Sequence, residues 1–136
     1  MKKIFSLAEA ERMLPLVGRI VEDLVRDHQR WTDKVAAFEL ATVGSTVNKP
    51  DPIAELLQSE AQRLAKDIEG YVAELVELGV TCKGMDTGLV DFPGQMEGRA
   101  VYYCWKLGEH GIQYWHDVNA GFAGRQRIKP LALAES

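Results

Sequence analysis

The chain has few cysteines, no long hydrophobic segment and no excess of positive charge, and each absence excludes a class of protein. Its two cysteines, Cys82 and Cys104, form no CxxC motif. The residues after Met1 contain only a few apolar positions before Glu9, which does not resemble a secretory signal. We therefore expect a reduced, cytoplasmic protein.

The same absences argue against two kinds of partner. A membrane-spanning helix needs roughly 20 consecutive apolar residues, and no run in the chain approaches that length. Nucleic-acid binding needs basic residues clustered on one face, whereas the formal net charge here is -4. We expect neither a membrane nor a nucleic acid as partner.

What is present is an ordinary globular composition. The chain has 136 residues, of which 46% are hydrophobic and 26% charged, and this suits one domain rather than a disordered segment. We predict a single domain over 1–136. Within it we expect a helical hairpin over 1–79, a sheet with a glycine-rich loop over 80–128, and a mobile tail over 129–136.

The first helix is predicted to begin at Ser6. Its hydroxyl can accept a hydrogen bond from the Glu9 amide while the Glu9 carboxylate bonds back to the Ser6 amide. The helical pattern continues to about Phe38, and Pro15 predicts either a kink or two abutting helices, because proline lacks the amide donor. A heptad-like seam with 4-3-4-3 spacing contains Ala10, Leu14, Val17, Val21, Leu24, His28, Trp31, Val35 and Phe38. His28 is the one polar member, and its role is not decided by the pattern.

A second helix is predicted after a loop over 40–50. Asp51 suits the N-cap, Pro52 suits the first helical position, and Gly79 suits the left-handed residue that follows a helix ending at Leu78. The apolar seam again has 4-3-4-3 spacing. The two helices therefore predict a long antiparallel hairpin.

The remaining chain predicts a small antiparallel sheet, which makes the fold class α+β. Four strands are expected over 80–83, 88–92, 99–107 and 112–116, separated by the turn-like segments GMDT, PGQMEG and GEHG. If Gly108 to Gly111 closes a four-residue hairpin loop, Tyr103 lies opposite His116. Tyr103 and His116 would then share one face of the sheet.

Several motifs in this order resemble a known family. They are FSLAEAERMLP at the start of the chain, GLVDFP (88–93), CWKLGE (104–109), YWH (114–116) and GFAGR (121–125). Together they resemble the bacterial family called domain of unknown function 2203, over nearly the whole chain. The resemblance implies no reaction, cofactor or catalytic residue.

One candidate site is a divalent metal centre. Asp86, Asp91, Glu109 and His116 offer carboxylate and imidazole ligands that suit manganese, iron or zinc. The structural alternative is that Asp86 serves the turn before Gly88, Asp91 pairs with Arg99, and Glu109 lies in a solvated loop.

The cysteines allow a second, weaker metal hypothesis. Cys82, Cys104, His110 and His116 supply the ligand count of a structural zinc site, but their spacing does not match one. Buried strand cysteines are usually small hydrophobic residues, and nothing in the sequence places a base beside Cys104.

A second candidate site would bind a small anion. Gly121, Gly124 and Arg125 could present backbone amides and a guanidinium, with Arg99 nearby. The structural alternative is a tight chain reversal that packs Phe122 into the core.

The apolar stripes of both helices are wider than one hairpin can bury, so we expect a homodimer or larger assembly. Two functions are consistent with these patterns. The favoured one is a non-catalytic, homo-oligomeric binding module. The alternative is a metal-dependent or acid-base enzyme acting on a small anionic substrate.

Overall fold

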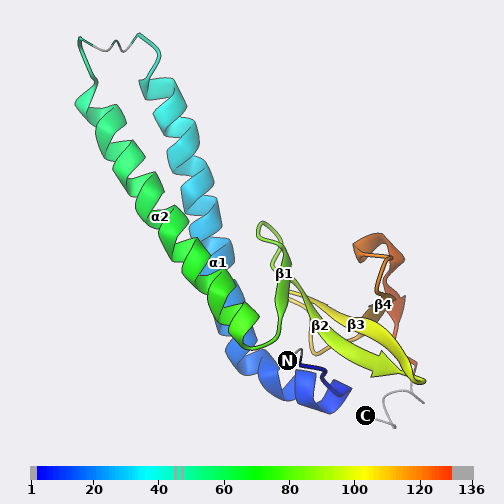
Figure 1. Cartoon of the computed structure of the whole chain (residues 1–136). Helices are drawn as coiled ribbons and strands as arrows, with labels where there is room; N and C mark the ends of the chain where they lie inside the picture. Colours follow the sequence, from blue (N-terminus) through cyan, green and yellow to red (C-terminus); the bar gives the residue numbers. More distant parts are fainter. Residues whose placement is uncertain (1–2, 45, 47, 130–136) are drawn as a thin grey trace.

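A computed structural model describes residues 3–44, 46 and 48–129 of the chain. Two long helices form an antiparallel hairpin, and a five-stranded antiparallel sheet follows them. Figure 1 shows the sheet beside one end of the hairpin, while the other end extends beyond it. The α+β class predicted from the sequence is confirmed.

The first helix, α1 (Leu7–Ala41), begins as predicted. The Glu9 amide donates to the Ser6 hydroxyl at 3.1 Å, and the Ser6 amide donates to the Glu9 carboxylate at 2.9 Å. Pro15 lies inside this single helix, so the alternative of two abutting helices is wrong. The dark blue first turns in Figure 1 bend away from the axis of the rest of α1, as expected where proline removes a hydrogen bond.

The second helix, α2 (Pro52–Glu77), also follows the sequence pattern. Asp51 caps it by accepting a hydrogen bond from the Ile53 amide at 2.9 Å. Leu78 is the C-cap, and Gly79 adopts a φ of 87° that a residue with a side chain rarely takes.

The sheet consists of β1 (Thr81–Gly84), β2 (Leu89–Met96), β3 (Arg99–Lys106), β4 (Tyr114–Asp117) and β5 (Gln126–Arg127), paired in that order. The prediction that 93–98 forms a turn is wrong, because β2 continues to Met96. Pro93 is tolerated there since it lies beyond the residues of β2 that pair with β1, and its carbonyl accepts a hydrogen bond from Phe5 at 2.7 Å. β5 was not predicted.

The predicted register between the third and fourth strands is wrong by one residue. Tyr102, not Tyr103, lies opposite His116, and Tyr103 lies opposite Trp115. The reason is that Ile112 does not join the ladder: its amide donates to the Glu11 carboxylate of α1 at 2.7 Å, and its side chain is buried in the core. Because strand side chains alternate, this slip moves His116 to the opposite face of the sheet.

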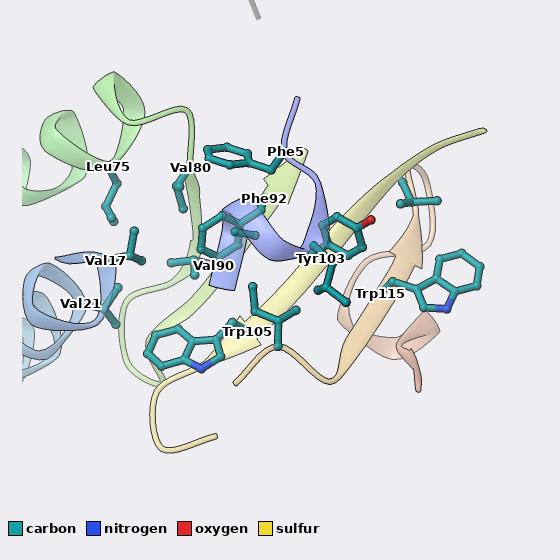
Figure 2. Close-up of a cluster of buried hydrophobic side chains, with 14 of the residues drawn as sticks. Phe5, Val17, Val21, Leu75, Val80, Val90, Phe92, Tyr103, Trp105 and Trp115 are labelled. Carbon is teal, nitrogen blue, oxygen red and sulfur yellow. The ribbon is translucent and has the colours of Figure 1, made fainter. Parts of the chain in front are cut away.

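The face of the sheet turned toward α1 is apolar and carries the core. Figure 2 shows Val17 and Val21 of α1 and Leu75 of α2 near side chains from this face. Those sheet residues are Val90, Phe92, Val101, Tyr103, Trp105 and Trp115. Gly88 permits the close approach, since a β-carbon there would lie 2.8 Å from Val21 and from Leu107.

The other face of the sheet is covered by the segment that follows β4. This segment contains a short 3-10 helix, η1 (Phe122–Gly124), and then β5, which pairs with β4. Phe122 is half exposed, so the alternative that it packs into the core is wrong. Its ring instead lies beneath the Lys106 ammonium and the Arg125 guanidinium.

Within the described ranges, no helix combines the length and the apolar character needed to cross a bilayer. The predicted mobile tail falls almost entirely on 130–136, outside the described residues.

Candidate functional site

A pocket of about 220 Å³ opens on the sheet face that the helices do not cover. It lies between this face and the segment after β4. The lining residues are Lys83, Leu89, Asp91, Tyr102, His116, Val118, Gly121 and Phe122. Two of them, Asp91 and His116, are almost completely buried, so the pocket has a polar and water-poor boundary on the sheet side.

Asp91 of β2 and His116 of β4 are in direct contact. The His116 Nε2 atom lies 3.1 Å from each carboxylate oxygen of Asp91, and Nδ1 lies 2.8 Å from the backbone carbonyl of Asp117. A carbonyl can only accept, so the hydrogen-bond network assigns a proton to Nδ1. The contact between Nε2 and the carboxylate then requires one further proton, shared between the two side chains, because two lone pairs would repel.

Cys104 of β3 lies next to this pair, because it pairs with Asp91 across the β2–β3 ladder. The sulfur, one Asp91 oxygen and one His116 nitrogen all lie within 4.8 Å of one another. Burial raises the pKa of the Cys104 thiol to about 11, although Arg125 opposes this by donating from Nε to the sulfur at 3.3 Å. The thiol is therefore protonated near neutral pH.

Arg125 is held in place by Glu109. Its NH2 and NH1 groups donate to the two Glu109 oxygens at 2.6 Å and 2.9 Å, and the guanidinium stacks 4.1 Å from the centre of the Tyr114 ring. Burial alone would raise the pKa of Glu109, but the hydrogen bonds from Arg125 and the Lys106 amide outweigh it and leave the pKa below its ordinary value. Glu109 and Arg125 thus form an ion pair in which the two opposite charges compensate each other.

The structure unites only half of the predicted metal ligands. Asp91 and His116 meet, whereas Asp86 is exposed and accepts a hydrogen bond from the Thr87 amide in the turn, as the structural alternative expected. Glu109 binds Arg125 instead of joining Asp91. Asp86 and Glu109 are therefore not part of the cluster.

The structure also separates the residues that were predicted to form the anion site. Arg99 lies 3.5 Å from Asp117, and not beside Asp91, so the alternative ion pair of Asp91 with Arg99 is not formed. Gly121 lines the pocket, with a φ of 66°. The Gly124 amide is already used, since it donates to the Gly121 carbonyl at 3.1 Å.

Sequence reasoning missed Lys83 and Tyr102 as members of the site, and it grouped Cys104 with His116 only in the weaker zinc hypothesis. Cys104 was considered for a zinc site, but with Cys82, which pairs with Val90 and so faces the core instead. Only the correct strand register places Cys104 beside Asp91 and Tyr102 beside His116. No local motif carries that information.

The polar side chains of the site are engaged with one another. Both nitrogens of His116 are engaged, so the imidazole presents no free lone pair to a molecule in the pocket. The Cys104 thiol is protonated and the Arg125 charge is matched by Glu109. Three potential metal-binding atoms nevertheless converge at the pocket's inner boundary.

The comparisons with known proteins identify one match. A family model described as "Uncharacterized conserved protein (DUF2203)" matches residues 3–128. Searches of curated proteins and of solved structures found no match.

Proposed function

The chain belongs to the DUF2203 family of uncharacterized conserved proteins, and this family has no assigned reaction, so we propose a function from the geometry of the pocket and its lining residues. The protein is a non-catalytic binding module that takes a small anionic molecule into the pocket beside Asp91 and His116. It acts as a homo-oligomer through its helical hairpin.

The observation that carries this proposal is a pocket whose inner boundary is polar, buried and fully hydrogen-bonded. The Asp91–His116 pair holds one shared proton and is neutral overall, so it does not repel an anion. Lys83 supplies a positive charge at the pocket, and Tyr102, whose hydroxyl can donate a hydrogen bond, also lines it. A volume of about 220 Å³ suits a ligand with few heavy atoms.

The hydrogen bonds that occupy both nitrogens of His116 support a non-catalytic role. The alternative, a metal-dependent or acid-base enzyme acting on a small anionic substrate, needs either an available His116 nitrogen or a metal ion in place of the shared proton. The hydrogen bonds of His116 disfavour the first route.

Incomplete burial of the hairpin supports self-association. In α1 the core cluster includes no residue beyond Val25. Further along the seam Trp31, Val35 and Phe38 are partly exposed, and Figure 1 shows this part of the hairpin extending away from the sheet. A second copy of the hairpin would cover these side chains, since the same apolar stripe would be present on both partners.

A reducing compartment such as the cytoplasm fits the two cysteines. Cys82 faces the core and Cys104 faces the pocket side of the sheet, and both are free thiols.

Binding is tested by calorimetry with inorganic phosphate and with small mono- and dicarboxylates. We expect one site per chain for at least one of these anions, and at least tenfold weaker binding in Lys83→Gln. Lys66→Gln is the matched control, because Lys66 is an exposed lysine of α2 and does not line the pocket. Equal loss in both variants, or no binding of any of these anions, would overturn the proposal.

A further inference from the structure

We propose that Asp91, Cys104 and His116 form a binding site for a transition-metal ion, with zinc as the best-matched metal. The ligands are the Asp91 carboxylate, the Cys104 sulfur and His116 Nε2, which come from three adjacent strands. This set differs from the one expected from the sequence, since it lacks Asp86 and Glu109 and gains the thiol.

The positions of the three groups are close to those that zinc requires. Bond lengths of about 2.0 to 2.3 Å to nitrogen, oxygen and sulfur place neighbouring ligands of a tetrahedral ion about 3.3 to 3.6 Å apart. His116 Nε2 lies 3.1 Å from the Asp91 oxygens, and the full set lies within 4.8 Å. Side-chain shifts of the order of 1 Å would complete the geometry without moving the strands.

The groups around the ligands orient them for this role. The Asp117 carbonyl accepts the Nδ1 proton of His116 at 2.8 Å, which leaves Nε2 as the nitrogen directed at Asp91. Backbone carbonyls orient metal-binding histidines in this way. Arg125 donates to the Cys104 sulfur, and Glu109 holds Arg125 in position, so a hydrogen bond is already in place to stabilise the thiolate.

The ligand types select the metal. A thiolate is a poor ligand for magnesium or calcium, which prefer oxygen atoms at six or more positions. Imidazole, thiolate and carboxylate together suit zinc, and cobalt(II) occupies the same kind of site.

Metal binding at this site releases protons. The Cys104 thiol loses its proton on forming the metal–sulfur bond. The proton shared by Asp91 and His116 also leaves, because the metal takes its place between Nε2 and the carboxylate.

Three protein ligands leave a coordination position open. Asp91 and His116 line the pocket, whereas Cys104 does not, so the pocket is the side from which a fourth ligand enters. The fourth ligand would be the small anion, and this assignment of the fourth ligand rests on the proposed binding function. The metal site itself does not depend on it, because water can fill the same position.

The test uses the full-length protein after treatment with a chelator and its removal. Cobalt(II) is added and the near-ultraviolet spectrum is followed, while zinc affinity is measured by competition with a chromophoric chelator. We expect one ion per chain, a sulfur-to-cobalt charge-transfer band, and release of protons when zinc is added in weakly buffered solution. Cobalt bound without a sulfur band would exclude Cys104 as a ligand and overturn the proposal.

The two cysteines supply a matched pair of variants. Cys104→Ser should abolish the charge-transfer band and weaken zinc binding at least a hundredfold, while Cys82→Ser, on the core face of the sheet, should leave both unchanged. His116→Gln should weaken zinc binding to a similar extent, and circular dichroism checks that each variant is folded. Retention of the band in Cys104→Ser, or its loss in Cys82→Ser, would contradict the assignment. If Cys104→Ser does not fold, the wild-type spectrum still decides the question.

Anion titrations of the metal-free and zinc-loaded protein separate this inference from the proposed function. Phosphate or carboxylate binding to protein that takes up no zinc would overturn the metal site and leave the binding function intact. Zinc binding with no anion affinity in either form would overturn the binding function alone.

Discussion

His116 lies directly opposite Tyr102 in the β3–β4 ladder, so its imidazole is on the sheet face that α1 does not cover. Asp91 occupies the same face two strands away, and the two side chains meet above Cys104 of the intervening strand. The buried polar cluster is therefore a direct product of strand register.

Replacing His116 alone should destabilise the protein more than replacing both Asp91 and His116. His116→Ala leaves the Asp91 carboxylate buried without its partner, and we expect a loss of about 3 to 5 kcal/mol in the free energy of unfolding. The double variant Asp91→Leu/His116→Phe should lose less, because no unpaired charge remains. Urea unfolding measures both, and a double variant less stable than His116→Ala would contradict this account.

The contact between the helices at Tyr71 should make stability depend on pH. The Tyr71 hydroxyl donates to Asp27 at 2.8 Å, and Asp27 is buried in α1. The Arg26 hydrogen bond, assisted by the one from Tyr71, lowers the pKa of Asp27 despite its burial. The folded protein therefore binds this proton less readily than the unfolded chain, so the stabilisation is present above the unfolded pKa of about 3.9 and is lost as the pH falls through the lower folded pKa.

Tyr71→Phe tests that contact. We expect a loss of about 1 kcal/mol at pH 7, because one hydrogen bond to a charged group disappears while those from Arg26 and Arg30 remain. The difference between wild type and variant should shrink as the pH falls through the folded pKa of Asp27, which lies below the unfolded value of about 3.9. A difference in urea midpoint that stays constant through the protonation of Asp27 in the folded protein would show that Asp27 is not the partner that matters.

Two glycine-to-alanine substitutions should change stability in opposite directions. A β-carbon at Gly94 would overlap the Tyr103 ring, so Gly94→Ala should cost about 1 to 3 kcal/mol through overpacking. At Gly70, inside α2, a β-carbon meets nothing within 4 Å, and Gly70→Ala should stabilise the helix by about 0.5 to 1 kcal/mol. Thermal unfolding that ranks the two variants in the reverse order would contradict the packing described for β2.

The proposed assembly predicts that Trp31 and Phe38 lie in a contact between copies. Light scattering should give a dimer mass or larger for the wild type at micromolar concentration, and Trp31→Glu or Phe38→Glu should reduce the mass toward that of one chain. Val76→Glu is the control, since Val76 is exposed near the end of α2 that lies by the sheet. Val21 and Leu24 are buried within the chain, so a charge at either position should unfold the protein rather than only dissociate it. A monomer mass for the wild type would remove the assembly from the proposed function.

The sequence by itself determined the helical hairpin, the start of each helix and the end of α2, whereas α1 continues to Ala41, beyond the predicted end near Phe38. Ser6 with Glu9, Asp51 with Pro52, and Gly79 act on the residues next to them, because capping and left-handed backbone are local effects. The alternation of apolar residues also identified most strands, and these local signals were sufficient for the fold class.

Only the tertiary structure decided the site. The Ile112 amide binds Glu11, which is 101 positions earlier, instead of joining the strand ladder. Such a long-range contact is not visible in the local sequence pattern, and a shift of one residue in the register moves His116 from the core face to the face it shares with Asp91 and Cys104. Arg125 pairs with Glu109, so Glu109 is not beside the other predicted metal ligands. This pairing likewise depends on how the segment after β4 folds back over the sheet.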